Sequence, residues 1–373
     1  MTGILGETAA GITAGGKIEM LCIGNAMVDV FAPADPAWLD GLGITGPVQH
    51  VDGTTAAAVL EKLRRGVPAP VAAAGGAAAN VAKIAAMLGV RSAFAGCVGR
   101  DDFAGIFTGE LEAAGVVPFL GEGEGNTGLC LVLETAPSGR APCGRTGRQR
   151  IAAAPGAALS LDEDAVSEEL VSGAEAVVLD GYMLDRHRLV RRVLKLANRH
   201  GIPVALDAAS VFQIREKTEA VLQYSRNYPL IVFMNADESI MFYSTIRKTA
   251  AGDAADLMSE REKEAFILRE ICPVLKCMTE GDIFPVIVIK LGGRGAVVLA
   301  GGNVHRAGTF AVTPKNTVGA GDAFCAAFLS AWIRGRPIRK CASLGNKVAR
   351  AILSVPGTGV RKEKLAGFAR GLG

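Results

Sequence analysis

Short apolar runs alternate with stretches of helical spacing along most of this chain. The runs are rich in Val, Ile, Leu and Ala, as in the buried strands of an α/β sheet. They cover Met20–Gly24, Ala93–Val98, Ala176–Asp180, Val204–Asp207, Leu230–Phe233 and Val286–Lys290. Helical spacing of apolar residues is found in Val81–Leu88, from Asp101 or Asp102 to Gly115, and from Asp322 onward. The alternation predicts a mainly parallel sheet with right-handed crossovers.

Residues 115–156 interrupt this alternation. They contain several glycines and two strand-like runs, Leu129–Leu133 and Gln149–Ala153, joined by a basic polar connector. Two β runs joined by a flexible loop between α/β units predict a small β excursion. We expect this excursion to form a lid from about residues 31–53 and 116–157.

Two local patterns predict details of the helices. Ser160–Glu163 is a capping-box pattern that would start a helix, and Asp185 would cap the next helix. Apolar residues of that next helix fall on one face, which predicts a solvated basic face on its other sides. The basic residues concerned are Arg186, Arg191, Arg192, Lys195 and Arg199.

Composition restricts the class of protein. The 373 residues are 50% hydrophobic, which is enough for a large core. A net charge of +3 and an aromatic content of 5% do not indicate a nucleic-acid partner. Eight cysteines are scattered without a Cys-x-x-Cys pair, which favours a reducing cytoplasm over a disulfide framework or a zinc site. We expect residues 1–18 to form a mobile tail, residues 19–373 the folded domain, and no secretion signal or membrane segment.

A loop of small residues opens a helix near the C-terminal end of the chain. Pro314 cannot lie inside a helix, and Gly319 and Gly321 allow a tight turn before Asp322. The free N–H groups and the positive dipole end at a helix start favour an anion such as phosphate. A carboxylate beside a bound phosphate has a function if it takes a proton from an attacking hydroxyl. The alternative is that Asp322 only caps a core helix.

Other glycine-rich stretches match neither a dinucleotide-binding fingerprint nor a phosphate-binding loop. Gly41–Gly46 and Gly123–Gly128 match Gly-x-Gly-x-x-Gly, but neither lies between a strand and a helix. Gly292–Gly295 follows a strand without the Lys-Ser/Thr of a phosphate-binding loop. A nicotinamide-dependent oxidoreductase is therefore the least favoured of the possible functions.

Two motifs resemble a known family. Asn316–Phe324 resembles the C-terminal signature of the PfkB (ribokinase-like) carbohydrate kinases, and Gly75–Asn80, with Gly89 and Gly99, resembles the N-terminal one. They occur in the order of that family, and the similarity runs from about Met20 to about Gly359. The resemblance implies a ribokinase-like three-layer α/β/α sandwich with a small β lid that keeps water from the phosphoryl group.

The resemblance also implies roles at the phosphate end of the site. Asp322 would be the catalytic base, and the main chain of Gly319, Ala320 and Gly321 would hold the developing negative charge. ATP would contact Asn235, Gly292, Gly295, Thr317 and Asn346. Mg²⁺ would be held near Asn235 and Glu238, largely through water, although the same pair could be a helix cap. Either Arg148 or Arg150 of the lid would contact the phosphate.

The acceptor site is expected from four residues. Asn25 and Asp29 follow the first strand, where an open α/β sheet binds ligands, and the resemblance adds Gly76 and Asn80 as sugar contacts. Gly24–Asp29 and Asn126–Val132 look most like the adenosine-kinase-like branch of the family, which favours a nucleoside. The alternatives are a kinase for ribose, fructose or ketodeoxygluconate, and a nucleotide sensor without turnover.

The remaining expectations concern partners and ions. We expect a monomer or homodimer that binds ATP and a small acceptor. Where the family usually has Asp beside a monovalent-cation site this chain has Asn316, so activation by K⁺ is not expected.

Overall fold

The protein is built around one large twisted sheet. The computed structural model describes residues 17–46, 48–66, 70–135, 148–281, 283–310, 312, 318–354 and 362–369. The sheet has nine strands in the order β14-β13-β12-β11-β10-β9-β1-β5-β6. Their bounds are β1 Met20–Ile23, β5 Ser92–Val98, β6 Val117–Glu122, β9 Val177–Asp180, β10 Val204–Asp207, β11 Leu230–Asn235, β12 Val286–Lys290, β13 Ala296–Ala300 and β14 Asn303–Ala307. All pairs are parallel except β12–β13 and β13–β14.

The strands are continuously apolar because both faces of the sheet are buried. In β1, Met20 and Cys22 belong to the core on one face, whereas Leu21 and Ile23 belong to the core on the other. Successive side chains of a strand point to opposite faces, so each strand supplies both cores. Helices must then cover both faces.

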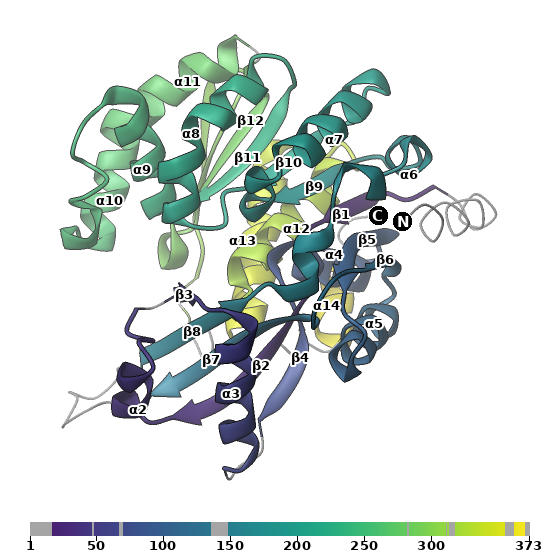
Figure 1. Ribbon diagram of the computed structural model, residues 1–373. Coiled ribbons are helices and arrows are strands. Elements are labelled where there is room, and N and C mark those ends of the chain that lie inside the picture. The colour runs from purple at the N-terminus through teal and green to yellow at the C-terminus, as the bar shows by residue number, and fades with distance from the viewer. Residues whose placement is uncertain are drawn as a thin grey trace.

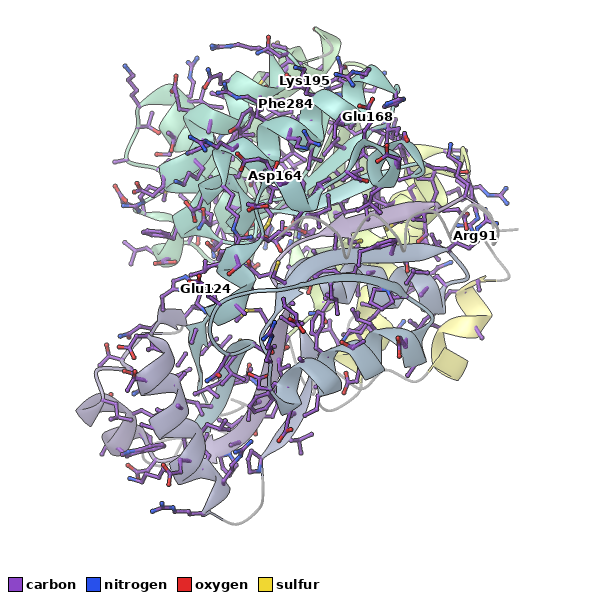
Figure 2. The ribbon with its side chains drawn as sticks, turned by 45° about the vertical axis from the view of Figure 1, so that its right-hand side comes forward. Arg91, Glu124, Asp164, Glu168, Lys195 and Phe284 are labelled. Carbon is purple, nitrogen blue, oxygen red and sulfur yellow. The ribbon has the colours of Figure 1, made fainter. Side chains whose placement is uncertain are left out.

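Helices lie on the two faces as separate layers (Figure 1). The first layer contains α4 Ala77–Met87, α5 Asp102–Ala114, α12 Ala320–Trp332, α13 Ile338–Leu353 and α14 Lys362–Ala369. The second contains α6 Glu168–Ser172, α7 His187–Arg199, α8 Val211–Ser225, α9 Ala236–Arg247, α10 Glu260–Phe266 and α11 Cys272–Glu280. Phe284, labelled in Figure 2, is fully buried in the core of the second layer. The expected three-layer α/β/α sandwich is confirmed.

Short helical turns complete the connections. They are η1 Gly156–Ser160, η2 Glu163–Ala165, η3 Gly181–Asp185, η4 Ala255–Leu257, η5 Ile267–Ile271 and η6 Gly292–Arg294. Five of these are 3₁₀ turns, and η5 is a π-helical turn that joins α10 to α11.

A second, five-stranded sheet projects from the sandwich (Figure 1). Its order is β3-β8-β7-β2-β4, with β2 Met27–Ala34, β3 Val48–His50, β4 Val71–Gly75, β7 Gly128–Thr135 and β8 Arg148–Ala154. One face packs against α2 Pro36–Gly41 and α3 Gly53–Arg64, chiefly through Leu39, Val59 and Leu63. Only the other face is free to meet a ligand.

The segments of this small sheet differ from the expected ones in three places, and the first is that β2 begins at Met27, before residue 31. β6 lies at the edge of the large sheet, although it falls inside residues 116–157. β4 belongs to the small sheet, although it lies outside both expected segments. β4 reads Val-Ala-Ala-Ala-Gly, and such small residues carry little strand signal.

Three expectations about helix starts and the tail are wrong in detail. Ser160 ends η1 instead of starting a helix, and Asp162 caps the turn that follows. Asp185 does not cap α7, because its carboxylate is bound by Lys217 and Gln213. Ile18 is buried and bridges Ala174, so the fold includes this residue of the expected tail; residues 1–16 lie outside the described residues.

The described helices also bear on a membrane location. None of them combines the length and the apolar character that a membrane span requires.

Candidate active site

The predicted residues meet in one cavity of about 550 Å³ between the small sheet and the carboxyl ends of the large-sheet strands. Twelve of them line it: Asn25, Asp29, Gly76, Asn80, Asn235, Glu238, Gly292, Gly295, Ala320, Gly321, Asp322 and Asn346. Gly319 lies at the start of α12 beside the cavity lining. Thr317 and Asn316 lie outside the described residues.

Asp322 stands in the first turn of α12. Gly319 is the N-cap residue, with φ of 78°, a conformation that favours glycine. Asn80 Nδ2 donates a hydrogen bond to Asp322 Oδ2 over 2.9 Å. Burial, with the nearby charge of Asp207, raises the pKa of Asp322 to about 6, although the Asn80 hydrogen bond and Lys290 act in the opposite direction. Asp322 is therefore ionised at neutral pH, yet basic enough to accept a proton.

Asn80 has a different position from the expected one. It lies inside α4, which begins at Ala77, rather than in a loop before the helix. Its amide nitrogen is bound to Asp322, so its carbonyl oxygen is the atom left to accept a hydrogen bond in the cavity.

Lys290 and Asp207 form an ion pair in the floor of the cavity. Lys290 Nζ lies 2.8 Å from Asp207 Oδ2, and the two side chains are 13% and 9% exposed. Burial alone would lower the pKa of Lys290, but the charges of Asp207 and Glu238 raise it above its usual value. A methyl group on Gly321 would lie 3.4 Å from Nζ, so the ammonium group reaches the start of α12. The cavity therefore has a fixed positive charge beside Asp322.

Asn235 and Glu238 form a reciprocal capping box at the start of α9. Glu238 N donates to Asn235 Oδ1 over 2.9 Å, and Asn235 N donates to Glu238 Oε2 over 2.7 Å. Burial of the Glu238 side chain raises its pKa to about 7. Each carboxylate oxygen accepts one bond from Asn235 and keeps a lone pair. The cap is thus real, and the same oxygens still line the cavity.

These oxygens could also hold a hard cation. In the part of the chain that the structure describes, no group of three or more His, Cys, Asp and Glu side chains is arranged around a metal position. Mg²⁺ commonly keeps several waters and takes one or two carboxylates together with substrate phosphates. The donor set of Asn235 and Glu238 fits that mode of binding.

Asp29 lies in the small sheet rather than in a loop after β1. It is the third residue of β2, pairs with Cys130 in β7 and Ala73 in β4, and is 4% exposed. Burial raises its pKa to about 6, against the charge of Lys83. A methyl group on Gly75 would collide with the Asp29 carboxylate. The glycine of the N-terminal motif thus makes room for an acidic group.

Arg186 does not belong to the solvated basic face on which it was predicted. Its Nη2 donates to Asn25 Oδ1 over 2.7 Å and to Ala158 O over 2.8 Å. Lys195 of α7 is exposed on the outer layer and is labelled in Figure 2. Arg191, Arg192 and Arg199 are exposed as well. Arg186 precedes the first turn of α7, and its side chain leaves the helix toward the cavity wall.

Three of the expected nucleotide residues, Gly292, Gly295 and Asn346, line the cavity. Gly292 is the first residue of η6 and Gly295 follows its last residue, between β12 and β13. Asn346 of α13 donates from Nδ2 to Ala307 O and Gly308 O, each over 3.1 Å. These bonds leave its carbonyl oxygen as the group available to a ligand.

Arg148 and Arg150 were the two candidates in the lid for a contact with the phosphate. Arg150 does not line the cavity, because its Nη1 binds Asp40 Oδ1 over 2.6 Å and Ile44 O over 2.8 Å on the helix-covered side of the small sheet. The side chain of Arg148 lies outside the described residues.

Sequence reasoning missed several residues of the cavity: Met27, His50, Cys130, Ile151, Asp180, Tyr182, Asp207, Ala209 and Lys290. Asp180 and Asp207 are the last residues of β9 and β10. Because ligands of open α/β sheets bind beyond the carboxyl ends of the strands, these acids could have been suspected. Burial raises the pKa of Asp180 to about 7.

Known proteins share this fold. The adenosine kinase from Sinorhizobium meliloti is 25% identical in sequence and has a TM-score of 0.77, with 96% of this chain and 100% of that one covered. A probable sugar kinase from Rhizobium etli CFN 42 is 22% identical, with a TM-score of 0.78 and coverage of 96% and 99%. The second similarity indicates the fold alone.

Curated relatives and a family match specify the chemistry. The 5-dehydro-2-deoxygluconokinase of Bacillus anthracis (strain CDC 684 / NRRL 3495) is 25% identical over 293 residues, which are 75% of this chain and 80% of that protein. The family described as pfkB family carbohydrate kinase matches residues 59–365. The kinase resemblance drawn from the two motifs is confirmed, and ATP is implied as a substrate. This chain belongs to the pfkB family of carbohydrate kinases.

Proposed function

We propose that this kinase transfers the γ-phosphoryl group of ATP to the hydroxymethyl group of a ribose-bearing nucleoside such as adenosine. The observation that carries the proposal is the placement of Asp322, which lines the same cavity as Asn25 and Asp29 and is held there by Asn80. A base and a set of groups suited to ribose hydroxyls therefore line one cavity.

The reaction follows from these positions. Asp322 accepts the proton of the acceptor hydroxyl while its oxygen attacks the γ-phosphorus, and the bond from that phosphorus to the bridging oxygen of ADP breaks. The N–H groups at the start of α12 face the negative charge that develops on the phosphoryl oxygens. Lys290 adds a fixed positive charge at this point, since its ammonium group approaches Gly321.

Asn235 and Glu238 would hold Mg²⁺ on the nucleotide side. A bound magnesium ion would supply charge neutralisation to the phosphates. The support is the buried Glu238 carboxylate, which lines the cavity with unused lone pairs. Gly292, Gly295 and Asn346 would contact the nucleotide, and Thr317 is proposed on the family resemblance.

The acceptor side matches a vicinal diol. The Asp29 carboxylate can accept two hydroxyl protons, whereas the Asn25 amide has a nitrogen that can donate. The Asn80 carbonyl oxygen is a further acceptor, and Gly76 also lines the cavity. A ribose ring presents neighbouring hydroxyls that can donate and accept at once.

The charge of the cavity favours a neutral acceptor over a sugar acid. Asp29, Asp180 and Asp322 all line it. Within the described residues, the cation Lys290 of the cavity lining is already paired with Asp207, and the nearby cations Lys83 and Arg186 already bind main-chain carbonyls. A substrate carboxylate placed about 4 Å from the ionised form of one of these acids would meet a repulsion of roughly 4 kcal/mol at an effective dielectric constant of 20.

A sugar-acid kinase is the second candidate. Its support is the name of the curated relatives, 5-dehydro-2-deoxygluconokinase, at 25% identity. The charge of the described cavity opposes it.

The small sheet would act as a lid over this site. Its uncovered face supplies Met27, Cys130 and Ile151 to the cavity, and closing it would exclude water that could hydrolyse ATP.

We also propose a cytoplasmic monomer or homodimer without a nucleic-acid partner; the free buried thiols of Cys22 and Cys325 suit a reducing compartment.

One assay separates the candidates. ADP release is measured with adenosine, ribose, fructose and 5-dehydro-2-deoxygluconate, for the wild type and for Asp29→Ala. We expect adenosine to give the highest kcat/KM, and Asp29→Ala to cost about 2–4 kcal/mol in that value because buried hydroxyls lose a charged partner. The control is 2′,3′-dideoxyadenosine, for which Asp29→Ala should change little. Preference for the sugar acid, or equal losses on both nucleosides, would contradict the ribose assignment.

A further inference from the structure

Arg186 joins the acceptor site to the base of the small sheet. Asn25 lies just before β2, where the chain enters the small sheet, and Ala158 lies in η1, just after β8, where the chain leaves it. The same guanidinium nitrogen binds both, over 2.7 Å and 2.8 Å. A second nitrogen, Nη1, lies 3.2 Å from Met183 Sδ in η3. Arg186 thus connects the residue that leads into β2, the turn that follows β8 and the turn that follows β9 of the large sheet.

The chemistry of arginine fixes the orientation of Asn25. A guanidinium group only donates hydrogen bonds, so the Asn25 atom that faces it must be the carbonyl oxygen. The amide nitrogen of Asn25 is then directed elsewhere, and in the described part of the chain it has no protein acceptor. Since Asn25 lines the cavity, Nδ2 is left as a donor for the acceptor molecule. Without Arg186 the amide could flip and present oxygen instead.

Acidic groups surround the guanidinium of Arg186 and stabilise its positive charge. Asp180, Asp185 and the thiol of Cys97 interact with it electrostatically. Asp180 lines the cavity and lies at the end of β9, beside β1. These groups compensate the cation electrostatically, while its Nη2 donates to the neutral oxygens Asn25 Oδ1 and Ala158 O.

We propose that Arg186 is a positioning residue that presents Asn25 as a hydrogen-bond donor to the acceptor and links this contact to the base of the small sheet, where Asn25 precedes β2 and Ala158 follows β8. This inference rests on the proposed function, because it takes the cavity wall at Asn25 as the acceptor site. It predicts that loss of Arg186 affects acceptor binding and lid closure together, and leaves the nucleotide site, which lies at Gly292, Gly295 and Asn346, largely unchanged.

The test compares Arg186→Met and Arg186→Lys with the control Arg188→Met. Arg188 is a neighbour whose side chain is 88% exposed and 3.7 Å from Glu163. For each variant the KM for adenosine, the KM for ATP, kcat, and ATP hydrolysis without acceptor are measured. We expect Arg186→Met to raise the acceptor KM about 10–100-fold, the scale of a lost hydrogen bond that involves a charged group. The KM for ATP should change less than about twofold, and the ratio of ATP hydrolysis to phosphoryl transfer should rise.

Arg186→Lys keeps the charge but has one donor atom in place of the guanidinium fork. It should lie between wild type and Arg186→Met in acceptor KM, and it tests the proposal if the Met variant does not fold. Arg188→Met should behave as wild type. An unchanged acceptor KM in folded Arg186 variants, or an equal rise of both KM values, would overturn the proposal.

A double-mutant cycle with Asn25→Ala addresses the link itself. If Arg186 acts through Asn25, adding Arg186→Met to Asn25→Ala should raise the acceptor KM little further. If the two effects multiply instead, Arg186 does not act through Asn25. The two proposals fail differently: a wild type that phosphorylates no ribose-bearing acceptor contradicts the proposed function, whereas a wild type that does, with normal Arg186 variants, contradicts only this inference.

Discussion

Four acidic side chains of the cavity are similar in chemistry and differ in their partners. Asp322 accepts a hydrogen bond from Asn80 Nδ2, and Glu238 accepts one from Asn235 N. Asp180 accepts one from Tyr182 N, and Asp29 lies beside Cys130. Burial raises the pKa of each one. Because a general base must be ionised and close to the hydroxyl it deprotonates, the partner of each acid decides which of them can serve. Asp322 stands at the start of α12 beside Lys290, whereas Glu238 at the start of α9 is held in the capping box with Asn235.

The Asn80 hydrogen bond can be tested through the pH profile. It lowers the pKa of Asp322, so Asn80→Ala should raise that pKa. The base works only when ionised, and kcat/KM therefore rises with pH through the Asp322 pKa, near 6 in the wild type. In Asn80→Ala this acidic limb should move to higher pH, with a smaller change above pH 8. The measurement is kcat/KM from pH 5 to pH 9, and an unmoved limb would mean that another acid controls the rate.

At the scale of elements, the sequence predicts the strands and the two motifs but not their neighbours. The apolar runs predict β10, β11 and β12, and the C-terminal motif predicts that Asp322 lies at a helix start. The Asp207–Lys290 pair was missed because its two strands are separated by β11 in the sheet, and strand order is not contained in a local pattern. Asp29 was placed in a loop because the alternation of Val28, Asp29 and Val30 was not taken as a strand with one polar face.

The Asp207–Lys290 pair allows the structural and catalytic roles of Lys290 to be separated. Lys290→Met leaves Asp207 buried without its partner and should destabilise the fold by about 3–5 kcal/mol. Adding Asp207→Leu removes the unpaired charge and should restore most of that stability. Activity should stay low in the double variant, by about 10²–10³-fold in kcat, because the positive charge at the phosphoryl group is still missing. Urea unfolding and kcat decide the matter: recovery of kcat together with stability would make Lys290 purely structural.

At the scale of the whole molecule, the two cores support a cavity that is costly to form. The large sheet is buried on both faces, and this apolar packing can stabilise a site that contains buried acids. An acid whose pKa is raised by folding destabilises the native state at any pH where it is ionised. The catalytic site is therefore expected to reduce stability at neutral pH, as is common for enzymes.

Asp322→Asn should lower turnover and raise stability at the same time. The variant keeps an oxygen for Asn80 but cannot accept the proton, so kcat should fall roughly 10²–10⁴-fold. In the wild type the pKa of Asp322 rises from 3.8 to about 6 on folding, so the native state binds the proton more tightly than the unfolded chain. Wild-type stability from this group falls as pH rises from about 4 to 6 and is constant above. The Asn variant lacks this loss and should be more stable by about 1–3 kcal/mol at pH 8. Urea unfolding of both proteins at pH 5 and pH 8 measures the difference in their free energies of unfolding, which should be larger at pH 8. A difference independent of pH would show that folding does not raise the pKa of Asp322.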